Sequence, residues 1–282
     1  MAVRIVADST CDLSKELIER YDIEIIPLMV TLGAKSGYDG VDITPEDIYK
    51  YVEKTGELSK TSAVSTWEFR EKFKKLRETG DELVVFTISS KFSACFQNAM
   101  TMAEELGGVF PVDTKNLSTG EGLVIIKAAE MAAAGKNAEE IVTACEELIP
   151  RVEASFVVDS IDYLRKGGRC SAIAALGANL FKIKPAIEVI DGAMEPGKKY
   201  RGSINKAITA YAEDRMKGRA DQIDMSRIFV THTKCDPEVI EYVKQLVKQY
   251  CPDVKEILET VAGATVTTHC GPGTLGVLFI RK

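Results

Sequence analysis

The feature that most constrains the fold is an alternation of short apolar runs with amphipathic segments in the N-terminal half. Apolar, β-rich runs occur at 3–7, 83–88 and 109–112, and each is followed by a polar turn and a helical pattern. Consecutive strand and helix units of these lengths favour right-handed crossovers and a parallel sheet covered by helices. We therefore expect an α/β/α domain over residues 1–158.

The segment between the first two units departs from this alternation. One strand is expected over 23–32, with a polar loop or hairpin insertion near 30–45. Thr44 as cap and Pro45 at the first helical position predict a short helix after it. Further capping boxes predict two helices that cover the sheet, one opened by Ser65 with Glu68 and one by Asn137 with Glu140.

The pattern changes after about residue 158. A helix-like stretch at 161–165 and a break at Gly167-Gly168 lead into an Ala-rich helix that is expected from Ser171. The remaining elements are strands at 186–190, 228–233, 255–261 and 275–280 and helices near 202–217 and 237–250. We interpret residues 159–282 as an α+β domain with a mixed sheet.

Composition excludes several classes of function. The 282 residues are 45% hydrophobic and 28% charged, as expected for a globular protein of two domains. The net charge of −6 argues against broad nucleic-acid binding, which needs a basic surface. The chain opens without a signal-peptide pattern and has no apolar run of about 20 residues, so we expect a cytoplasmic protein without stable membrane insertion.

Cysteines and histidines do not indicate a metal site. Seven cysteines without a CxxC pair predict small buried apolar side chains, neither a disulfide framework nor a zinc ribbon. Two histidines exclude a three-histidine zinc site, although His232 with Cys235 and His269 with Cys270 could supply ligands. We expect no metal and no cofactor.

Sequence signatures of common enzymes are absent or misplaced. There is no GxxxxGK[ST] or GxSxG, and the GxGxxG match at 271–276 precedes a C-terminal apolar strand, whereas a dinucleotide site opens a helix. Ser93 and His269 could meet in space, but no aspartate is identifiable to orient the histidine. His269 is expected on a tight glycine-rich loop, where it is either a structural donor or lies close to a ligand.

Hydroxyl groups are concentrated where ligands bind in parallel sheets, outside the carboxyl ends of the strands. The residues concerned are Ser9, Thr10, Ser89, Ser90, Ser93, Thr114 and Ser118. Each turn also precedes a helix, whose free N–H groups favour an anion. Together they indicate an anionic head group, and the alternative is that each serine or threonine only caps its helix.

Several motifs, taken in order along the chain, resemble the DegV family over essentially its whole length. They are Asp8-Ser9-Thr10, TSAVS at 61–65, SSKFS at 89–93, the segment 159–169 with YLRKGGR at its end, IKPA at 183–186 and HCGPGTLG at 269–276. The YLRKGGR and HCGPGTLG motifs are the specific ones. Two departures lie beside the hydroxyls: the family's Gln-Pro is Ala63-Val64, and its Gly-Thr is Ala94-Cys95.

This resemblance implies a carrier that holds one long-chain fatty acid in a tunnel between two domains. It also implies that the carrier presents the carboxyl group to a separate fatty acid kinase, within phospholipid metabolism. Carried over by motif, Thr61, Ser93 and His269 would surround the carboxylate and Ser62 would lie nearby. Arg169 would be placed behind them or at the domain junction.

Other readings of the chain remain open at this point. The alternatives to a non-catalytic carrier are a Ser-dependent acyl hydrolase or thioesterase, a kinase-like transferase, and a purely structural or regulatory interaction protein. A basic cluster on this acidic chain predicts docking of an acidic partner such as the kinase subunit, and the alternative is a solvated face. The cluster consists of Lys198, Lys199, Arg201 and Lys206.

Overall fold

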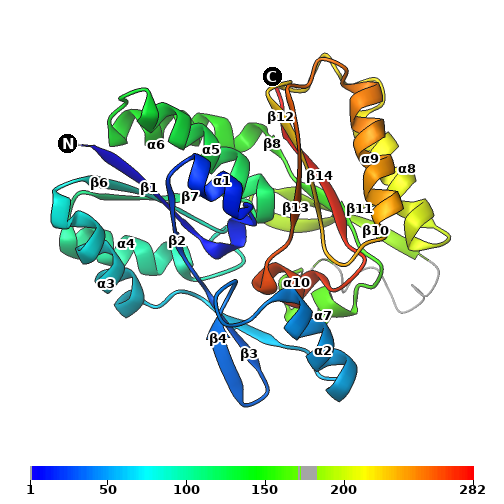
Figure 1. The fold of residues 1–282 in the computed structure, drawn as a ribbon, viewed down its shortest axis with the longest axis horizontal. Coiled ribbons are helices and arrows are strands. Elements are labelled where there is room, and N and C mark those ends of the chain that lie inside the picture. Colours follow the sequence, from blue (N-terminus) through cyan, green and yellow to red (C-terminus); the bar gives the residue numbers. More distant parts are fainter. Residues whose placement is uncertain (1, 171, 173–182) are drawn as a thin grey trace.

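The protein is built around two main sheets with a third, small sheet beside them (Figure 1). The computed structural model describes residues 2–170, 172 and 183–282. The Ala-rich helix expected from Ser171 lies outside these residues. No helix in the described ranges is long and apolar enough to cross a membrane.

The first sheet is parallel throughout, in the order β2-β1-β6-β7. Its strands are β1 (Val3–Asp8), β2 (Ile23–Ile26), β6 (Glu82–Thr87) and β7 (Val109–Asp113). The helices of this half are α1 (Lys15–Arg20), α3 (Thr66–Leu76), α4 (Cys95–Leu106), α5 (Ser118–Ala133) and α6 (Ala138–Leu148). The predicted parallel sheet is confirmed.

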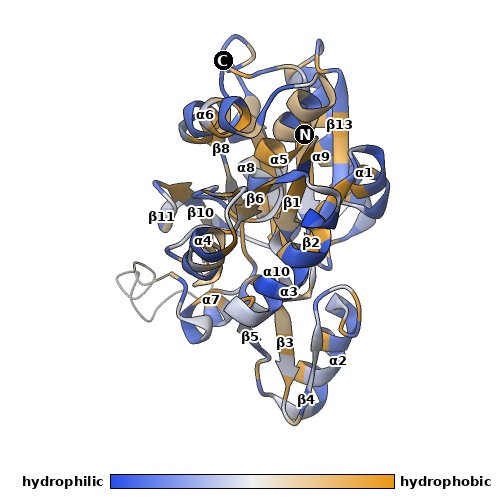
Figure 2. Ribbon diagram, turned by 90° about the vertical axis from the view of Figure 1, so that its left-hand side faces the viewer, coloured by the Kyte–Doolittle hydropathy of each residue, from blue (hydrophilic) through white to orange (hydrophobic). Residues whose placement is uncertain are grey.

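Side-chain alternation assigns these helices to opposite faces of the sheet. Val6 and Val85 pack in one cluster with the phenylalanines of α3, whereas Ile5 and Val84 pack in another with α5 and α6. Figure 2 shows the same division, with apolar residues on the central strands and polar ones on the outer sides of the helices. The capping boxes at Ser65 and Asn137 are both present, so the predicted helix starts are confirmed.

The single strand expected over 23–32 is wrong. The chain leaves the first sheet after Ile26, and a new strand begins at Met29 in a different sheet. Pro27 lies at the break, where its missing N–H cannot continue the ladder. The small sheet has the order β4-β3-β5, from β3 (Met29–Leu32), β4 (Lys35–Tyr38) and β5 (Lys60–Ser62).

The predicted hairpin is confirmed as β3 and β4, which pair antiparallel. Thr44 and Pro45 open α2 (Pro45–Thr55) as expected, and Thr44 forms a capping box with Asp47. The unit projects from the rest of the molecule in Figure 1. Strand β5, which carries Thr61, was not expected, because three polar residues give no strand pattern.

The second sheet is mixed, as predicted. Among the described residues it has seven strands in the order β11-β10-β9-β14-β12-β13, with β8 paired to β14, and only β12 and β13 run parallel. The strands are β8 (Val152–Glu153), β9 (Ser155–Val157), β10 (Ile183–Ile190), β11 (Ala193–Arg201), β12 (Arg227–His232), β13 (Glu256–Val261) and β14 (Leu275–Ile280). The helices are α7 (Asp162–Gly167), α8 (Ile204–Met216), α9 (Pro237–Tyr250) and α10 (Ala264–Cys270).

Helix α5 joins the two halves. Eleven of its sixteen residues are buried, and its core cluster includes strands of both sheets through Val84 and Leu278. Strands β8 and β9 already belong to the second sheet, so sheet membership changes near residue 152. The domain boundary at residue 158 stays a prediction.

Candidate functional site

A small apolar cavity lies where the small sheet, the first sheet and α10 meet. It encloses about 40 Å³, and we name it the Thr61–His269 cavity. Its polar lining residues are Thr61, Ser93, Arg169, Thr265 and His269, and its apolar ones include Leu28, Ala63, Ile88, Phe92, Leu117 and Val266. Three residues predicted from different segments, Thr61, Ser93 and His269, thus share one cavity.

His269 lies in the last turn of α10, so its expected placement on a glycine-rich loop is wrong. Its Nε2 atom is 2.8 Å from the Thr61 Oγ1 atom. Burial and the nearby Arg169 charge lower the pKa of His269 to about 4. The ring is therefore neutral near pH 7, and it can donate or accept one hydrogen bond at Nε2 according to its tautomer.

Contacts with α7 position the histidine ring. A Cβ atom on Gly167 would collide with His269 Nδ1, and a Cβ atom on Gly271 would collide with the ring of Tyr163. Gly271 also has φ +70°, a conformation that favours glycine. The YLRKGGR and HCGPGTLG motifs therefore pack directly against each other.

Helix α10 is fixed at its start by carboxylates from the N-terminal half. The Asp39 carboxylate accepts hydrogen bonds from the N–H groups of Ala264 (2.7 Å) and Thr265 (3.1 Å). Asp12 accepts from the N–H of Gly263 at 2.8 Å. The sequence analysis missed both residues, since they lie more than 220 positions from the helix they cap.

Ser93 lies just before α4. Its Oγ atom accepts from the Cys95 N–H at 3.3 Å and lies 3.2 Å from the Cys95 sulfur. A thiol sulfur is a weak hydrogen-bond acceptor, so the Ser93 hydroxyl can rotate and donate instead to a stronger acceptor that enters the cavity. Both departures from the family pattern lie at this cavity: Ala63 lines it, and Cys95 contacts Ser93, which also lines it.

Ser62 and Arg169 differ from the other predicted residues. Ser62 is exposed, because side chains of a strand alternate and Thr61 points into the cavity. Arg169 lines the cavity and is exposed at its rim, with Nη1 donating to the Gly167 carbonyl at 2.7 Å. Its contact at 3.4 Å with the Phe92 carbonyl crosses between the two halves.

Most hydroxyls of the βα turns are occupied within the protein. Ser9 donates to Asp39, Ser89 to the Gly192 carbonyl, Ser90 to Asp113, Thr114 to the Thr87 carbonyl and Ser118 to Asp12. Of this set, Ser93 is the one that lines the Thr61–His269 cavity. Of the turns at which an anion site was expected, the turn before α4 is therefore the remaining candidate.

A second apolar cavity of about 30 Å³ adjoins the first. The two share Leu117, Val266 and Cys270 as a common wall. Each volume is only a few times the roughly 10–15 Å³ that one water molecule needs. A long acyl chain would therefore require these shared side chains to move, and the predicted tunnel stays a prediction.

A cluster of buried carboxyl groups, missed by the sequence analysis, lies beneath the loop that follows β1. The Thr10 hydroxyl is 2.5 Å from Asp8 Oδ1 and 3.1 Å from Glu121 Oε2. Burial raises the pKa of Asp8 to about 6 and that of Asp12 to about 8, and burial with the Asp8 charge raises the pKa of Glu121. In the described part of the chain no basic side chain forms an ion pair with them.

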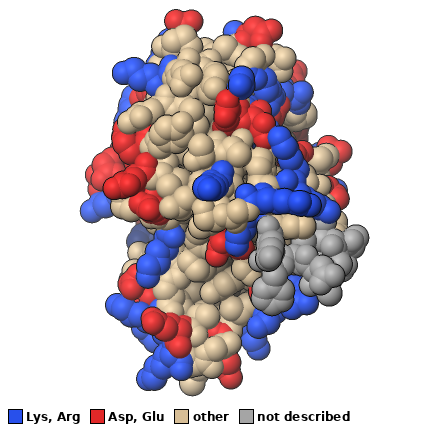
Figure 3. All heavy atoms as spheres, turned by 90° about the vertical axis from the view of Figure 1, so that its right-hand side faces the viewer, with Lys and Arg blue, Asp and Glu red and all other residues tan. Residues whose placement is uncertain are grey.

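The predicted basic cluster lies at the end of β11 and the start of α8. All four side chains are exposed, and Figure 3 shows Lys and Arg gathered on this face of the molecule. Lys198 is 2.5 Å from Asp214 Oδ2, so its charge is partly neutralised. Strand β11 is an edge strand, where exposed lysines also prevent pairing with other chains.

A model of the DegV family, described as uncharacterised proteins, matches residues 2–282. The chain belongs to the DegV family. A DegV domain-containing protein of Caldanaerobacter subterraneus is 32% identical over 99% of both chains. A fatty acid-binding protein of Thermotoga maritima is 35% identical, and the match covers 98% of this chain and 96% of that protein.

Solved structures of the DegV family share the fold over the full length. A fatty acid-binding DegV family protein of Thermus thermophilus has a TM-score of 0.91 at 28% identity, with both chains fully covered. DegV of Bacillus subtilis, a fatty acid-binding protein, has a TM-score of 0.88 at 28% identity, again over all of both chains. A stearic acid-binding protein of Eubacterium ventriosum has a TM-score of 0.80 at 27% identity, over 99% of this chain and 98% of that one.

Proposed function

We propose that this DegV-family protein binds one long-chain fatty acid, with its carboxyl group at Thr61, Ser93 and His269. The observation that carries the proposal is the convergence of these three residues, from three distant segments, on one apolar cavity between the two halves. The fatty acid-binding relatives of similar fold support it.

The acyl tail would supply most of the affinity. Burying a methylene contributes roughly 0.8 kcal/mol, so a chain of about sixteen carbons contributes on the order of 12 kcal/mol before the costs of binding. The two adjoining cavities provide the path, with apolar walls that include Leu117 and Val266. Movement of their shared wall would join them into the tunnel.

The head group needs orientation more than charge. Thr61 and Ser93 offer hydroxyl donors, and neutral His269 can donate through Nε2 either to Thr61 Oγ1, which then directs its own hydroxyl hydrogen to the ligand, or to the carboxylate itself. Arg169 at the rim would add one cation beside the carboxylate while remaining in contact with water. Such a site leaves the carboxyl oxygen accessible to a second protein, here an acyl-phosphate-forming kinase whose docking on the exposed Lys199 and Arg201 we also propose.

The geometry favours a carrier over a hydrolase. A serine nucleophile needs a histidine base that is oriented by an acid. In the described residues, His269 Nδ1 has no hydrogen-bond partner and faces Gly167, and Nε2 is bonded to Thr61. A pKa near 4 also makes His269 a poor base at neutral pH.

The test begins with the fatty acid that co-purifies with the protein, measured by mass spectrometry of a solvent extract. We expect near-stoichiometric lipid in the wild type, and a Kd raised roughly ten- to a hundred-fold in Ser93→Ala and in His269→Ala. Ser62→Ala is the matched control, because Ser62 is adjacent to Thr61 but exposed, and it should bind like the wild type.

Two outcomes would contradict the proposal. Absence of both co-purified and titrated fatty acid would remove the carrier function. Turnover of an acyl thioester that is lost in Ser93→Ala would instead identify a hydrolase. A separate measurement addresses docking: Lys199→Glu with Arg201→Glu should weaken kinase association without changing lipid content, and unchanged association would remove that part.

A further inference from the structure

A third cavity, with a mostly polar lining, lies beside strands β8, β9 and β10 of the second sheet. It encloses about 500 Å³, within the range of small-molecule sites. Its wall is formed by α8, the end of β14, the loop after β7 and the turn between β10 and β11. We name it the arginine cleft, after Arg215, Arg219 and Arg281, which surround Glu153.

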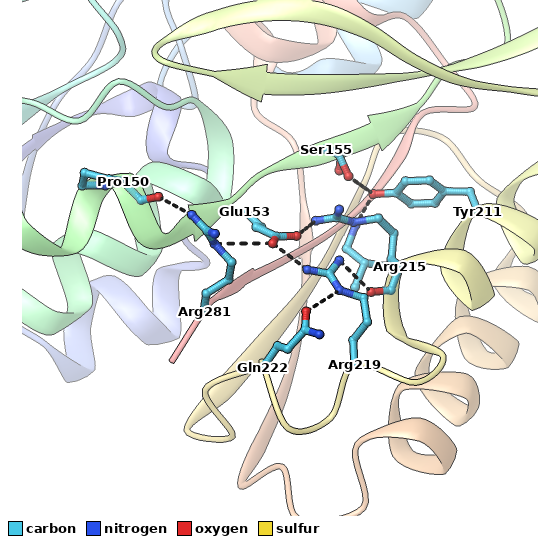
Figure 4. Close-up of polar contacts among 9 residues, drawn as sticks. Pro150, Glu153, Ser155, Tyr211, Arg215, Arg219, Gln222 and Arg281 are labelled. Atoms are coloured by element: carbon cyan, nitrogen blue, oxygen red, sulfur yellow. Dashed lines mark hydrogen bonds and ion pairs between the residues drawn. The ribbon is translucent and has the colours of Figure 1, made fainter.

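Three guanidinium groups converge on one carboxylate in this cleft (Figure 4). Arg219 Nη2 is 2.6 Å from Glu153 Oε1, and Arg215 Nη2 is 2.9 Å from Oε2. Arg281 Nε lies 3.5 Å from Oε1. Burial alone would raise the pKa of Glu153, but the arginine hydrogen bond and charges lower it overall, so the carboxylate is ionised near pH 7.

The guanidinium groups are held in place by contacts other than Glu153. Arg215 and Arg219 lie over the ring of Phe279, at 5.0 and 5.4 Å from its centroid. Arg281 Nη2 donates to the Pro150 carbonyl at 2.8 Å. A cationic arrangement that is fixed in advance loses less conformational entropy when it binds an anion.

The arginine cleft contains N–H groups without an acceptor in the described part of the chain, and its lining has more cations than carboxylates. Arg215 Nε is buried without an acceptor among the described residues, and Arg215 Nη2 contacts Glu153 without hydrogen-bond alignment. Lys115 adds a fourth cation to the lining, against the carboxylates of Glu153, Glu188 and Asp191. The lining thus carries four cations and three carboxylates, and among the described residues Glu153 is the carboxylate that pairs with the arginines.

We propose that the arginine cleft binds a phosphate dianion, as free phosphate or as the phosphate group of a small polar molecule. A guanidinium group matches phosphate with two parallel N–H donors, and the three arginines carry two positive charges more than the Glu153 carboxylate that they surround. The volume beyond the arginines accommodates the body of a phosphate monoester. The cleft is separate from the fatty-acid site and shares only Ala154 and Val189 with the lining of the second apolar cavity.

The test is calorimetric titration of the full-length protein with inorganic phosphate and, separately, with AMP, both at low ionic strength. We expect saturable binding that weakens roughly ten- to a hundred-fold in Arg219→Gln and in Arg281→Gln. Arg70→Gln is the matched control, because Arg70 pairs with Glu105 on the exposed surface away from the cleft, and it should bind like the wild type.

The Glu153→Gln variant distinguishes two roles for the arginines: binding a phosphate ligand, or only stabilising the fold through their ion pairs with Glu153, which we call a structural clamp. If Glu153 competes with the ligand, removing its charge should raise phosphate affinity roughly ten-fold, and phosphate should restore the thermal stability lost by the variant. A clamp predicts lower stability that phosphate does not restore, and this result would overturn the proposal. Absence of saturable binding to the wild type and to Glu153→Gln would overturn it as well.

Tighter binding of AMP than of phosphate would identify a phosphate monoester as the ligand, and equal or weaker binding would identify the anion itself. Binding that is unchanged in both arginine variants would place phosphate elsewhere and overturn the assignment. These outcomes are independent of lipid content, so they distinguish failure of this proposal from failure of the fatty-acid function.

Discussion

The Thr61–His269 cavity and the arginine cleft are both proposed anion sites, but their linings differ in charge. In the cavity, the hydroxyls of Thr61, Ser93 and Thr265 and a neutral imidazole lie among apolar side chains, and its one arginine is at the rim. In the cleft, three arginines face a polar, open space. A ligand with a long tail can bind strongly through burial, so its head group needs only to be oriented. A ligand without a tail depends on charge. The Thr61–His269 cavity therefore suits the first kind of ligand and the arginine cleft the second.

Filling the wall between the apolar cavities should have the largest effect. Val266→Phe places a ring where both cavities meet, and displacing about four methylenes of a tail costs roughly 3 kcal/mol, about a hundred-fold in affinity. Overpacking itself costs about 1–3 kcal/mol of stability. Lipid content by mass spectrometry should fall while phosphate binding at the cleft is retained.

Val261→Phe is the control for this change, since Val261 is 58% exposed and the added ring should leave lipid content unaltered. Equal lipid in Val266→Phe and the wild type would show that the tail follows another path.

Ionic strength should affect ligand affinity at the two sites differently. Raising the ionic strength from about 0.05 to 0.5 M shortens the screening length several-fold, so phosphate affinity at the exposed cleft should fall roughly ten-fold. Fatty-acid affinity should change less than about two-fold, because burial of the tail is not screened. Parallel titrations of one preparation measure both, and an equal salt dependence would contradict the contrast.

Displacing His269 should lower fatty-acid affinity by about ten-fold. Gly167→Ala introduces a Cβ atom that collides with His269 Nδ1 and moves the ring away from Thr61. Gly168→Ala is the control: Gly168 has φ +68° and open space around it, so alanine there costs about 1–2 kcal/mol of stability but leaves the ring in place. If both variants lose affinity equally, local instability and not the ring position is responsible.

The buried carboxyls provide the smallest effect, in a region where neither proposed ligand lies. Because the pKa of Asp12 is about 8 in the folded protein and near 4 when unfolded, the folded state retains a proton that the unfolded state releases between these values. Stability should therefore decrease as the pH rises from about 4 to 8. Asp8 contributes in the same direction up to about pH 6, and the neighbouring Asp39 carboxylate adds repulsion.

Asp12→Asn removes this titration while its amide can still accept from Gly263 and donate to Ser118. Thermal melts at pH 8 to 9 should show a gain on the order of 1 kcal/mol, or a few degrees in Tm, with little change near pH 4. Loss of stability at every pH would mean that the carboxylate is required as a charged cap of α10.

Sequence patterns predicted the regular parts of the fold because the signals there are local. Strands β1, β6 and β14 and the capping boxes at Ser65 and Asn137 depend on residues that are adjacent or three apart. Strands β5 and β11 were missed because their residues are mostly polar, and pairing partners elsewhere in the chain hold them. Helix α10 was missed because its caps, Asp12 and Asp39, come from the other end of the sequence.

The candidate site shows the same limit. The resemblance identified Thr61, Ser93 and His269, and the structure brings them to one cavity. That Ser62 turns outward follows from β5, which no local pattern revealed. The arginine cleft was not found at all, because Glu153 and its three arginines lie on separate elements and are spread over almost 130 positions.

The wall of the Thr61–His269 cavity is divided among three substructures: the small sheet with Thr61, the first half with Ser93, and the second half with His269. A molecule that contacts all three acts as an internal cross-link, and its binding free energy adds to the free energy that keeps them assembled. Under the proposed function, lipid supply would set both how much of the protein is loaded and how long each copy survives, because the unloaded chain would open more often. Protein abundance would in this way report on the fatty acid it holds.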